Sequence, residues 1–271
     1  MLNKDGFINL LNEEKNEEEY QQFLEHNSKL IPTGAFKLNH GVHMSLIFSK
    51  MPIGSMYKSD FFLISKSSAE WNLIFIELEK PNANLFTKEG RYAQDLNAGI
   101  KQINDWKSYF YKLENQLSFR EHPVIKKLLS FNSALYENPI NFRYILVIGR
   151  RKKLIDNNQL KYWRTLNKES GDTYYMTYDS LYEGIKQEND RYICHIEKDF
   201  LCIDSEKMLP GDSELGISLL CHTDCNGIKI KQSLYDEVLK YQNNNIGNYN
   251  KILGNDFEKK LSILKKNIYT K

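Results

Sequence analysis

The chain has 271 residues, of which 41% are hydrophobic and 27% charged, a balance typical of a soluble globular protein with one large or two modest domains. A formal net charge of +2 does not indicate a strongly basic nucleic-acid binder, although it leaves room for local basic patches. No apolar run approaches the roughly 18 residues that span a bilayer, and the chain does not start with a basic segment followed by an apolar core. We therefore expect a cytoplasmic protein without a membrane partner.

The first third of the chain predicts one helix followed by three strands. Residues 12–26 carry apolar side chains at helical spacing and predict an amphipathic helix. Residues 43–49 predict a strand, and the next five residues, MPIGS, a turn. Residues 57–65 and 71–79 are rich in aromatic and aliphatic residues and flank the short polar stretch KSSAE, so together they predict a β-hairpin.

The middle of the chain predicts further helices and strands. Between residues 87 and 117 the apolar residues step by three or four, as on one buried face of a long helix. The stretch NFRYILVIGR, residues 141–150, is nearly continuous in apolar residues and predicts a central strand covered on both faces. The other elements expected are a short helix at 124–129, a helix at 158–168, a strand at 173–177 and a helix starting near Asp179. This order predicts a mixed α/β domain that ends near residue 190.

Residues 191–271 alternate short apolar pieces with turns and end in a lysine-rich amphipathic helix at 256–268, so we interpret them as a C-terminal extension of unknown role. All four cysteines of the chain lie here, and Cys221, His222 and Cys225 suggest a zinc site. The segment has no C-x2-C pair, however, and in a cytosolic protein buried free thiols are the more ordinary interpretation.

Three carboxylates of the predicted hairpin indicate a metal site. Glu77 and Glu79 point to one face of their strand, whereas Lys80 points to the other. Asp60 lies early on the partner strand, about opposite Phe75, and therefore within a step or two of both glutamates. Adjacent buried carboxylates repel unless something compensates, and hard oxygen ligands suit Mg²⁺ or Mn²⁺. Such an ion activates water and offsets charge on a phosphate, so the pattern favours phosphodiester cleavage.

Two further groups of polar residues are candidates for the same site. Gln102 lies one turn before Trp106 on the predicted long helix, where it would reach the carboxylates, and Glu25 on the first helix is another acid that would approach them. Basic residues with the right placement for phosphate contact are Lys88 and Arg91 at the start of the long helix, and Arg150, Arg151 and Lys152 after the central strand. The ordinary alternative is a set of solvated surface charges.

The pattern resembles the PD-(D/E)XK nuclease superfamily, because an aspartate is followed by E-x-E on a hairpin and by Q-x-x-x-W on a helix. More narrowly, the chain resembles the Shedu family of bacterial anti-phage defence nucleases. The stretches that carry this narrower resemblance are, in order, FLEHNSKLIP, FIELEKP, AGIKQINDW, NFRYILVIGRRKKL and TYYMTYDSL. They cover roughly residues 15–185, and residues 190–271 contribute nothing to it.

The resemblance implies a restriction-endonuclease-like core at residues 1–190, with a mixed central sheet flanked by helices, and an extension at 191–271. It also implies that Asp60 and Glu77 bind the metal and that Gln102 lies beside the site. The family pattern expects a lysine that polarises water at position 79, where this chain has Glu79. Some restriction enzymes of the superfamily have a glutamate there, as a base or a second metal ligand, whereas other members that lost the lysine lost activity.

A lysine from elsewhere in the chain is an alternative source of the missing charge, and the candidates are Lys58, Lys88 and Lys101. Two functions follow from the resemblance. One is a Mg²⁺- or Mn²⁺-dependent DNA endonuclease or nickase in anti-phage defence, with homo-oligomers expected. The other is a catalytically lapsed nuclease fold that acts as a DNA-binding or sensing module. A third interpretation, from the cysteines alone, is a zinc-stabilised interaction protein.

Overall fold

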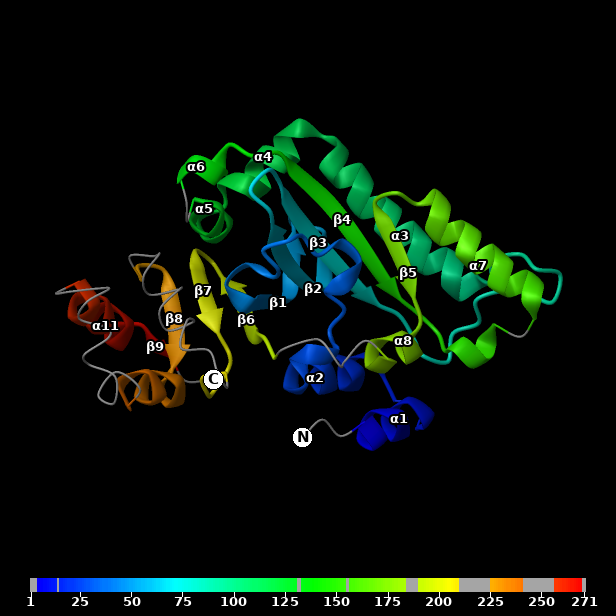
Figure 1. The fold of residues 1–271 in the computed structure, drawn as a ribbon, viewed down its shortest axis with the longest axis horizontal. Helices are drawn as coiled ribbons and strands as arrows, with labels where there is room; N and C mark the ends of the chain where they lie inside the picture. The colour runs from blue at the N-terminus through cyan, green and yellow to red at the C-terminus, as the bar shows by residue number, and fades with distance from the viewer. Residues whose placement is uncertain are drawn as a thin grey trace.

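The computed structural model describes residues 4–13, 15–130, 133–154, 156–183, 190–209, 225–240 and 256–269. Its core is one nine-stranded sheet in the order β5-β4-β3-β2-β1-β6-β7-β8-β9 (Figure 1). The strands are β1 (Leu46–Ile53), β2 (Tyr57–Lys66), β3 (Trp71–Leu78), β4 (Ile140–Val147), β5 (Thr173–Met176), β6 (Tyr192–Glu197), β7 (Phe200–Ile203), β8 (Ile228–Lys231) and β9 (Ile268–Tyr269). Strands β1 to β3 are antiparallel, as are β6 and β7, whereas the other neighbouring pairs are parallel.

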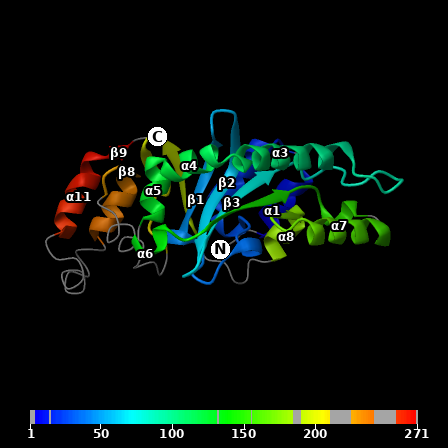
Figure 2. The same ribbon diagram turned by 90° about the horizontal axis from the view of Figure 1, so that it is seen from above.

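Helices cover both faces of the sheet. The α-helices are α1 (Lys4–Asn12), α2 (Glu17–His26), α3 (Gln94–Tyr111), α4 (Leu113–Glu121), α5 (Pro123–Leu129), α6 (Ser133–Tyr136), α7 (Asn157–Glu169), α8 (Tyr178–Glu183) and α11 (Asp256–Lys266). Helices α1, α2 and α8 pack together on one face, and α3, α4 and α5 pack on the other (Figure 1). Seen from above, α3 runs alongside β2 and β3, and α7 lies at the opposite end of the molecule from α11 (Figure 2). The mixed α/β class predicted from the element order is confirmed.

The hairpin of β2 and β3 supplies most of the core, as its composition predicts. Every residue of β3 is buried, because one face packs under α3 and the other under α1 and α2. Phe75 shows the α3 side of this packing, since its ring centroid lies 5.2 Å from that of Phe110 and 6.4 Å from that of Trp106. Fully burying such a ring stabilises the fold by roughly 1.5–3 kcal/mol.

The predicted helix at 87–117 is wrong at its start and is interrupted near its end. Residues 87–91 form a tight turn in which Thr87 N–H donates to the Arg91 carbonyl and Gly90 N–H to the Thr87 carbonyl. Gly90 has a φ of 80°, which an α-helix does not accept, so α3 begins only at Gln94. Lys112 is extended, with a ψ of 121°, and separates α3 from α4.

The other predicted elements are found with small shifts, and two features differ. The strand expected at 43–49 begins at Leu46 and continues to Ile53, so the turn expected at MPIGS is shorter and follows at Gly54, whose φ is 61°. Helix α1 was not predicted from the sequence.

Strands beyond residue 190 extend the same sheet, because β6 pairs in parallel with β1 from Leu46–Tyr192 onward. The proposed boundary near residue 190 stays a prediction. Cys221 and His222 of the suggested zinc site lie outside the described residues, whereas Cys194, Cys202 and Cys225 are buried and form no disulfide in the described part. Within that same part, no helix combines the length and the apolar character needed to cross a membrane.

Candidate active site

Asp60 and Glu77 face each other at the end of the β2–β3 ladder. The paired residues run from Lys66–Trp71 to Phe61–Ile76, and one further step places Asp60 opposite Glu77. The backbone pairing stops there, and Asp60 Oδ2 instead accepts a hydrogen bond from the Leu78 N–H at 2.7 Å. The register therefore brings Asp60 closer to Glu77 than the predicted position opposite Phe75, because Phe75 in fact pairs with Phe62.

Glu77 is a buried carboxyl group with one oxygen left over. Glu77 as a whole is 8% exposed, and its Oε1 accepts a hydrogen bond from Gln102 Nε2 at 2.5 Å. Its Oε2 is also buried and accepts no hydrogen bond from any described residue. Burial, followed by the negative charges of Asp60 and Glu79, raises the pKa of Glu77 to about 10. Without a cation, Glu77 is therefore protonated at neutral pH.

Glu79 lies just beyond the end of β3, against α3. A side chain at Gly99 of α3 would have its Cβ 3.3 Å from Glu79 Cγ and 2.9 Å from Leu146 Cδ2, so a glycine is needed for this close approach. Burial raises the pKa of Glu79 to about 7, with further contributions from the charges of Glu17 and Asp60. Glu79 is consequently half ionised near neutral pH, which is the condition that favours a general base.

Lys50 of β1 supplies a cation that the sequence did not reveal. Its Nζ lies 2.6 Å from Asp60 Oδ1, and its side chain remains 55% exposed. Lys50 has a φ of 50°, a left-handed conformation that is uncommon for a lysine and that lies within the strand beside the carboxylates. The expected strand ended at residue 49, so no sequence signal placed Lys50 in register with Asp60.

The other lysines considered from the sequence have no described contact with these carboxylates. Lys101 Nζ pairs with Asp105 at 2.7 Å, one helical turn away on α3. Lys58 lies on β2 with its backbone paired to Pro52, and Lys88 is exposed in the turn before α3. Lys50 is therefore the described lysine that pairs with the site.

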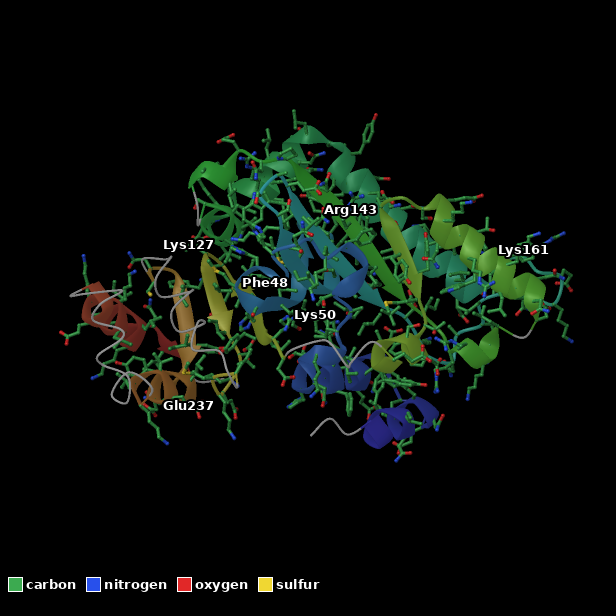
Figure 3. The ribbon with its side chains drawn as sticks, viewed as in Figure 1. Phe48, Lys50, Lys127, Arg143, Lys161 and Glu237 are labelled. Atoms are coloured by element: carbon green, nitrogen blue, oxygen red, sulfur yellow. The ribbon has the colours of Figure 1, made fainter. Side chains whose placement is uncertain are left out.

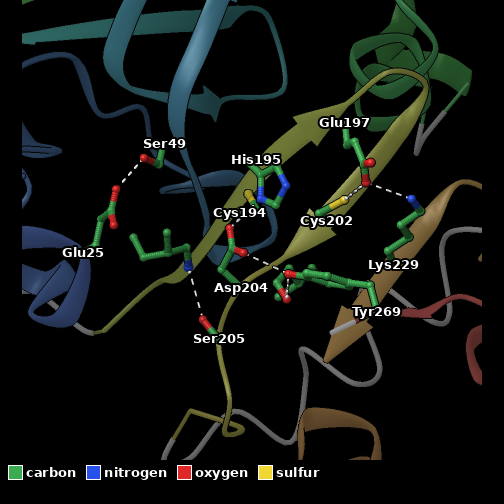
Figure 4. Close-up of polar contacts among 12 residues, drawn as sticks. Glu25, Ser49, Cys194, His195, Glu197, Cys202, Asp204, Ser205, Lys229 and Tyr269 are labelled. Atoms are coloured by element: carbon green, nitrogen blue, oxygen red, sulfur yellow. Dashed lines mark hydrogen bonds and ion pairs between the residues drawn. The ribbon is translucent and has the colours of Figure 1, made fainter. Parts of the chain in front are cut away.

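Helix α2 also contributes an acid, although not the one considered from the sequence. Glu25 Oε1 accepts a hydrogen bond from Ser49 Oγ at 2.5 Å (Figure 4). It also accepts one from Gln21 Nε2 at 3.2 Å. The acid of α2 whose charge acts on Glu79 is instead Glu17, in the first turn of the helix. The sequence could not distinguish the two, because the packing of α2 on the sheet is a tertiary property that its own residues do not specify.

The carboxylates fit a sparsely liganded hard cation. Among the described residues, no three His, Cys, Asp or Glu side chains form a ready-made metal cage. Mg²⁺ does not need one, because it usually keeps several waters and takes only one or two carboxylates. The unpartnered Glu77 Oε2, beside Asp60, offers an oxygen of this kind. A divalent cation would favour the ionised form of Glu77 and remove the cost of burying its charge.

The basic residues after β4 are engaged differently from one another. Arg150 is 8% exposed, and its Nε and Nη2 both lie 3.0 Å from Asp179 Oδ1, so its guanidinium ties β4 to α8. Arg151 forms two hydrogen bonds with Glu183, at 2.7 and 2.5 Å. Lys152 is exposed and forms no ion pair with a described residue.

Lys88 and Arg91, in the turn before α3, are likewise exposed and have no ion pair within the described part of the chain. The structure therefore leaves Lys88, Arg91 and Lys152 open to solvent, whereas Arg150 is held inside the protein and Arg151 is paired on its surface.

Comparison with known proteins identifies one family. The family model described as Shedu protein SduA, C-terminal, matches residues 14–182, which include all the carboxylates of the site. The match covers more than half of the chain and ends before β6. No curated protein matches the chain.

Proposed function

The chain belongs to the Shedu family, and we propose that it is a metal-dependent DNA endonuclease or nickase of anti-phage defence, built on a PD-(D/E)XK core. The observation that carries the proposal is the buried, unpartnered Glu77 Oε2 beside Asp60. A buried carboxyl group with a free oxygen is costly in a purely structural role, because nothing compensates its desolvation. At a metal site the same oxygen would serve as a ligand of the ion.

In this proposal Asp60 and Glu77 bind Mg²⁺ or Mn²⁺, which when bound polarises water and offsets phosphate charge. Gln102 holds Glu77 through its hydrogen bond to Oε1 and leaves Oε2 as the oxygen that would take the ion. Glu79 in its ionised form accepts a proton from the attacking water, and the resulting hydroxide attacks phosphorus while the bond to the leaving sugar oxygen breaks and that oxygen takes a proton from solvent water. A pKa of about 7 suits Glu79 to this step at neutral pH.

Lys50 takes the place of the lysine that the family pattern expects at position 79. Its ammonium group is 2.6 Å from Asp60 and its side chain is more than half exposed, so we propose that it swings toward a phosphate oxygen. It would then stabilise the negative charge that develops on the phosphate. DNA phosphates are proposed to be contacted by Lys88, Arg91 and Lys152. Arg150 instead stabilises the fold through its ion pair with Asp179, and Arg151 pairs with Glu183 on the surface.

The second candidate is a lapsed nuclease that binds or senses DNA without cutting it. Glu79 at the position of the expected lysine favours it, as does the ion pair that already occupies Asp60. In either function we propose homo-oligomers, and light scattering of the full chain tests that part.

The decisive experiment is cleavage of supercoiled and linear DNA in Mg²⁺, Mn²⁺ or EDTA. We expect the wild type to cut only with metal and Glu77→Ala to be inactive. Glu25→Gln is the matched control, since Glu25 is a carboxylate that accepts its hydrogen bonds from Ser49 and Gln21. Cleavage by Glu77→Ala at the wild-type rate would refute the proposed site. An inert wild type that gains cleavage as Glu79→Lys would establish the lapsed function.

A further inference from the structure

Helix α7 carries three cations along one exposed face. Lys161, Arg164 and Lys168 are spaced three and four residues apart, so they follow a single stripe about 10 Å long. All three are exposed, and none forms an ion pair with a described residue. Figure 3 shows Lys161 on α7 at the end of the molecule farthest from α11. We call these three residues the α7 stripe.

The side chain of Asn167 fixes α7 to the sheet, because it forms the two backbone hydrogen bonds that a neighbouring strand would form. Asn167 Oδ1 accepts from the Tyr175 N–H at 2.8 Å, and Asn167 Nδ2 donates to the Tyr175 carbonyl at 3.0 Å. The amide therefore satisfies both backbone groups on the outer side of β5, the edge strand of the sheet. This double contact, with the buried Leu166, sets the rotation of α7 and directs the α7 stripe to solvent before any ligand binds.

The loop that leaves the candidate active site packs against α7. Residues 79–93 connect the end of β3 to α3, and within this loop the Phe86 ring lies 6.1 Å from that of Tyr162. A side chain at Gly90 would have its Cβ 3.0 Å from Tyr162 Cε2, and Lys153 Nζ donates to Asn84 Oδ1 at 3.2 Å. The loop residues Lys88 and Arg91 are thus held next to α7.

Carboxylates also lie on or beside these segments. Asp95 Oδ2 accepts from the Asn84 N–H of the loop at 3.0 Å, and Glu169 of α7 and Glu89 of the loop form no ion pair with the α7 stripe within the described part of the chain. Glu169 adds to burial in raising the pKa of Tyr92, and a hydrogen bond from Thr87 lowers the pKa of Glu89. The α7 stripe and the loop residues Lys88 and Arg91 thus place five exposed cations on two segments that pack against each other.

From this arrangement we infer that the α7 stripe binds the phosphate backbone of double-stranded DNA beside the segment that enters the active site. The inference rests on the proposed nuclease function for the identity of the partner, and on charge complementarity for the surface. A rigid row of cations suits a regular row of phosphates, because the protein loses little side-chain and helix freedom on binding. Contacts of this kind position a duplex and do not read its sequence.

The test compares DNA binding by two triple variants of the full chain in EDTA, both in a Glu77→Gln background. The first neutralises the stripe as Lys161→Ala, Arg164→Ala and Lys168→Ala. The second makes the same charge change at Lys207, Lys240 and Lys259, three exposed lysines near the other end of the chain. Alanine favours helix, and circular dichroism checks that α7 is retained. Fluorescence anisotropy with a labelled duplex gives the affinity at several salt concentrations.

We expect the stripe variant to lose at least tenfold in affinity near physiological salt, and its slope of log K against log salt to shrink by up to about 2.7. The control variant should keep the wild-type slope. Equal slopes for the two variants would overturn the inference, and so would a stripe-dependent preference for single-stranded DNA or RNA over duplex DNA. If the wild type never cuts DNA but the stripe variant has a smaller salt slope, the inference stands and the nuclease proposal fails. If the wild type cuts DNA but the stripe variant keeps the wild-type salt slope, the nuclease proposal stands and the inference fails.

Discussion

Because Glu77 is buried, we predict how the free energy of unfolding depends on pH. Glu77→Gln keeps the shape of the side chain and an acceptor for Gln102 Nε2, but it removes the titrating group. In the wild type the pKa of Glu77 is raised to about 10, whereas in the unfolded chain it returns to its ordinary value of 4.5. Between these two values the native state holds a proton that the unfolded state has released. The free energy of unfolding of the wild type therefore falls as pH rises.

The size of the effect follows from the linkage relation. Each pH unit within this window costs the wild type about 1.4 kcal/mol relative to the glutamine variant, so between pH 5.5 and 8.0 the difference grows by roughly 3 kcal/mol. Glu79 also titrates in this range, but it is present in both proteins and cancels in the comparison. Mg²⁺ should reverse the trend, because a cation at Glu77 favours the ionised form. It should therefore stabilise the wild type at pH 8.0 more than the variant.

Urea unfolding at several pH values, in EDTA and in excess Mg²⁺, measures both effects. Glu25→Gln serves again as the control for replacing a carboxyl group by an amide. Parallel stability curves for the wild type and Glu77→Gln in EDTA would refute the reasoning, since Glu77 would then titrate as an ordinary solvated acid. Equal stabilisation of the two proteins by Mg²⁺ would refute the metal site at Glu77 itself.

Three further predictions concern the charged residues Lys50, Glu79 and Arg150. Lys50→Met should lower single-turnover cleavage on the order of 100-fold, while calorimetry with Mn²⁺ should show metal binding at Asp60 retained; an unchanged rate would exclude Lys50 from phosphate stabilisation. In the wild type, kcat/KM should rise with pH through about 7, the pKa of Glu79, and Glu79→Gln should lose this limb of the pH profile. Arg150→Ala should cost about 3–5 kcal/mol in urea unfolding, because it leaves Asp179 buried and unpaired. Its DNA-binding salt slope should stay unchanged, and a slope smaller by about one would indicate a phosphate contact.

The sequence predicted those parts of the site that depend on local periodicity. Period-two alternation is a property of a single strand, so the shared face of Glu77 and Glu79 follows from two residue numbers. The hairpin was equally visible, because two apolar runs flank a short polar turn. The register was the first uncertain step. The position of Asp60 relative to Glu77 depends on where the turn is centred, and an error of one residue there moves the partner by two.

The parts that the sequence did not predict come from separate elements. Lys50 reaches Asp60 only because β1 pairs with β2 in one particular register. The run from Arg150 to Lys153 consists of four similar cations, yet Arg150 is buried because Asp179 lies behind it, 29 residues later in the chain. Charge patterns indicate that a segment is basic. Which of its cations face solvent depends on tertiary packing, which a single sequence does not contain.

The glutamate at position 79 has a structural counterpart on β1. A lysine at 79 would place its positive charge at the end of β3, where this chain instead has an acid with a pKa of about 7. The positive charge stands one element away, on Lys50, 2.6 Å from Asp60. The site thus keeps an ammonium group near its aspartate and gains, at position 79, a group able to accept a proton. An ammonium ion at neutral pH has no free site for that proton, so in the mechanism that we propose the exchange divides two roles between two residues, with Lys50 stabilising charge and Glu79 acting as the base.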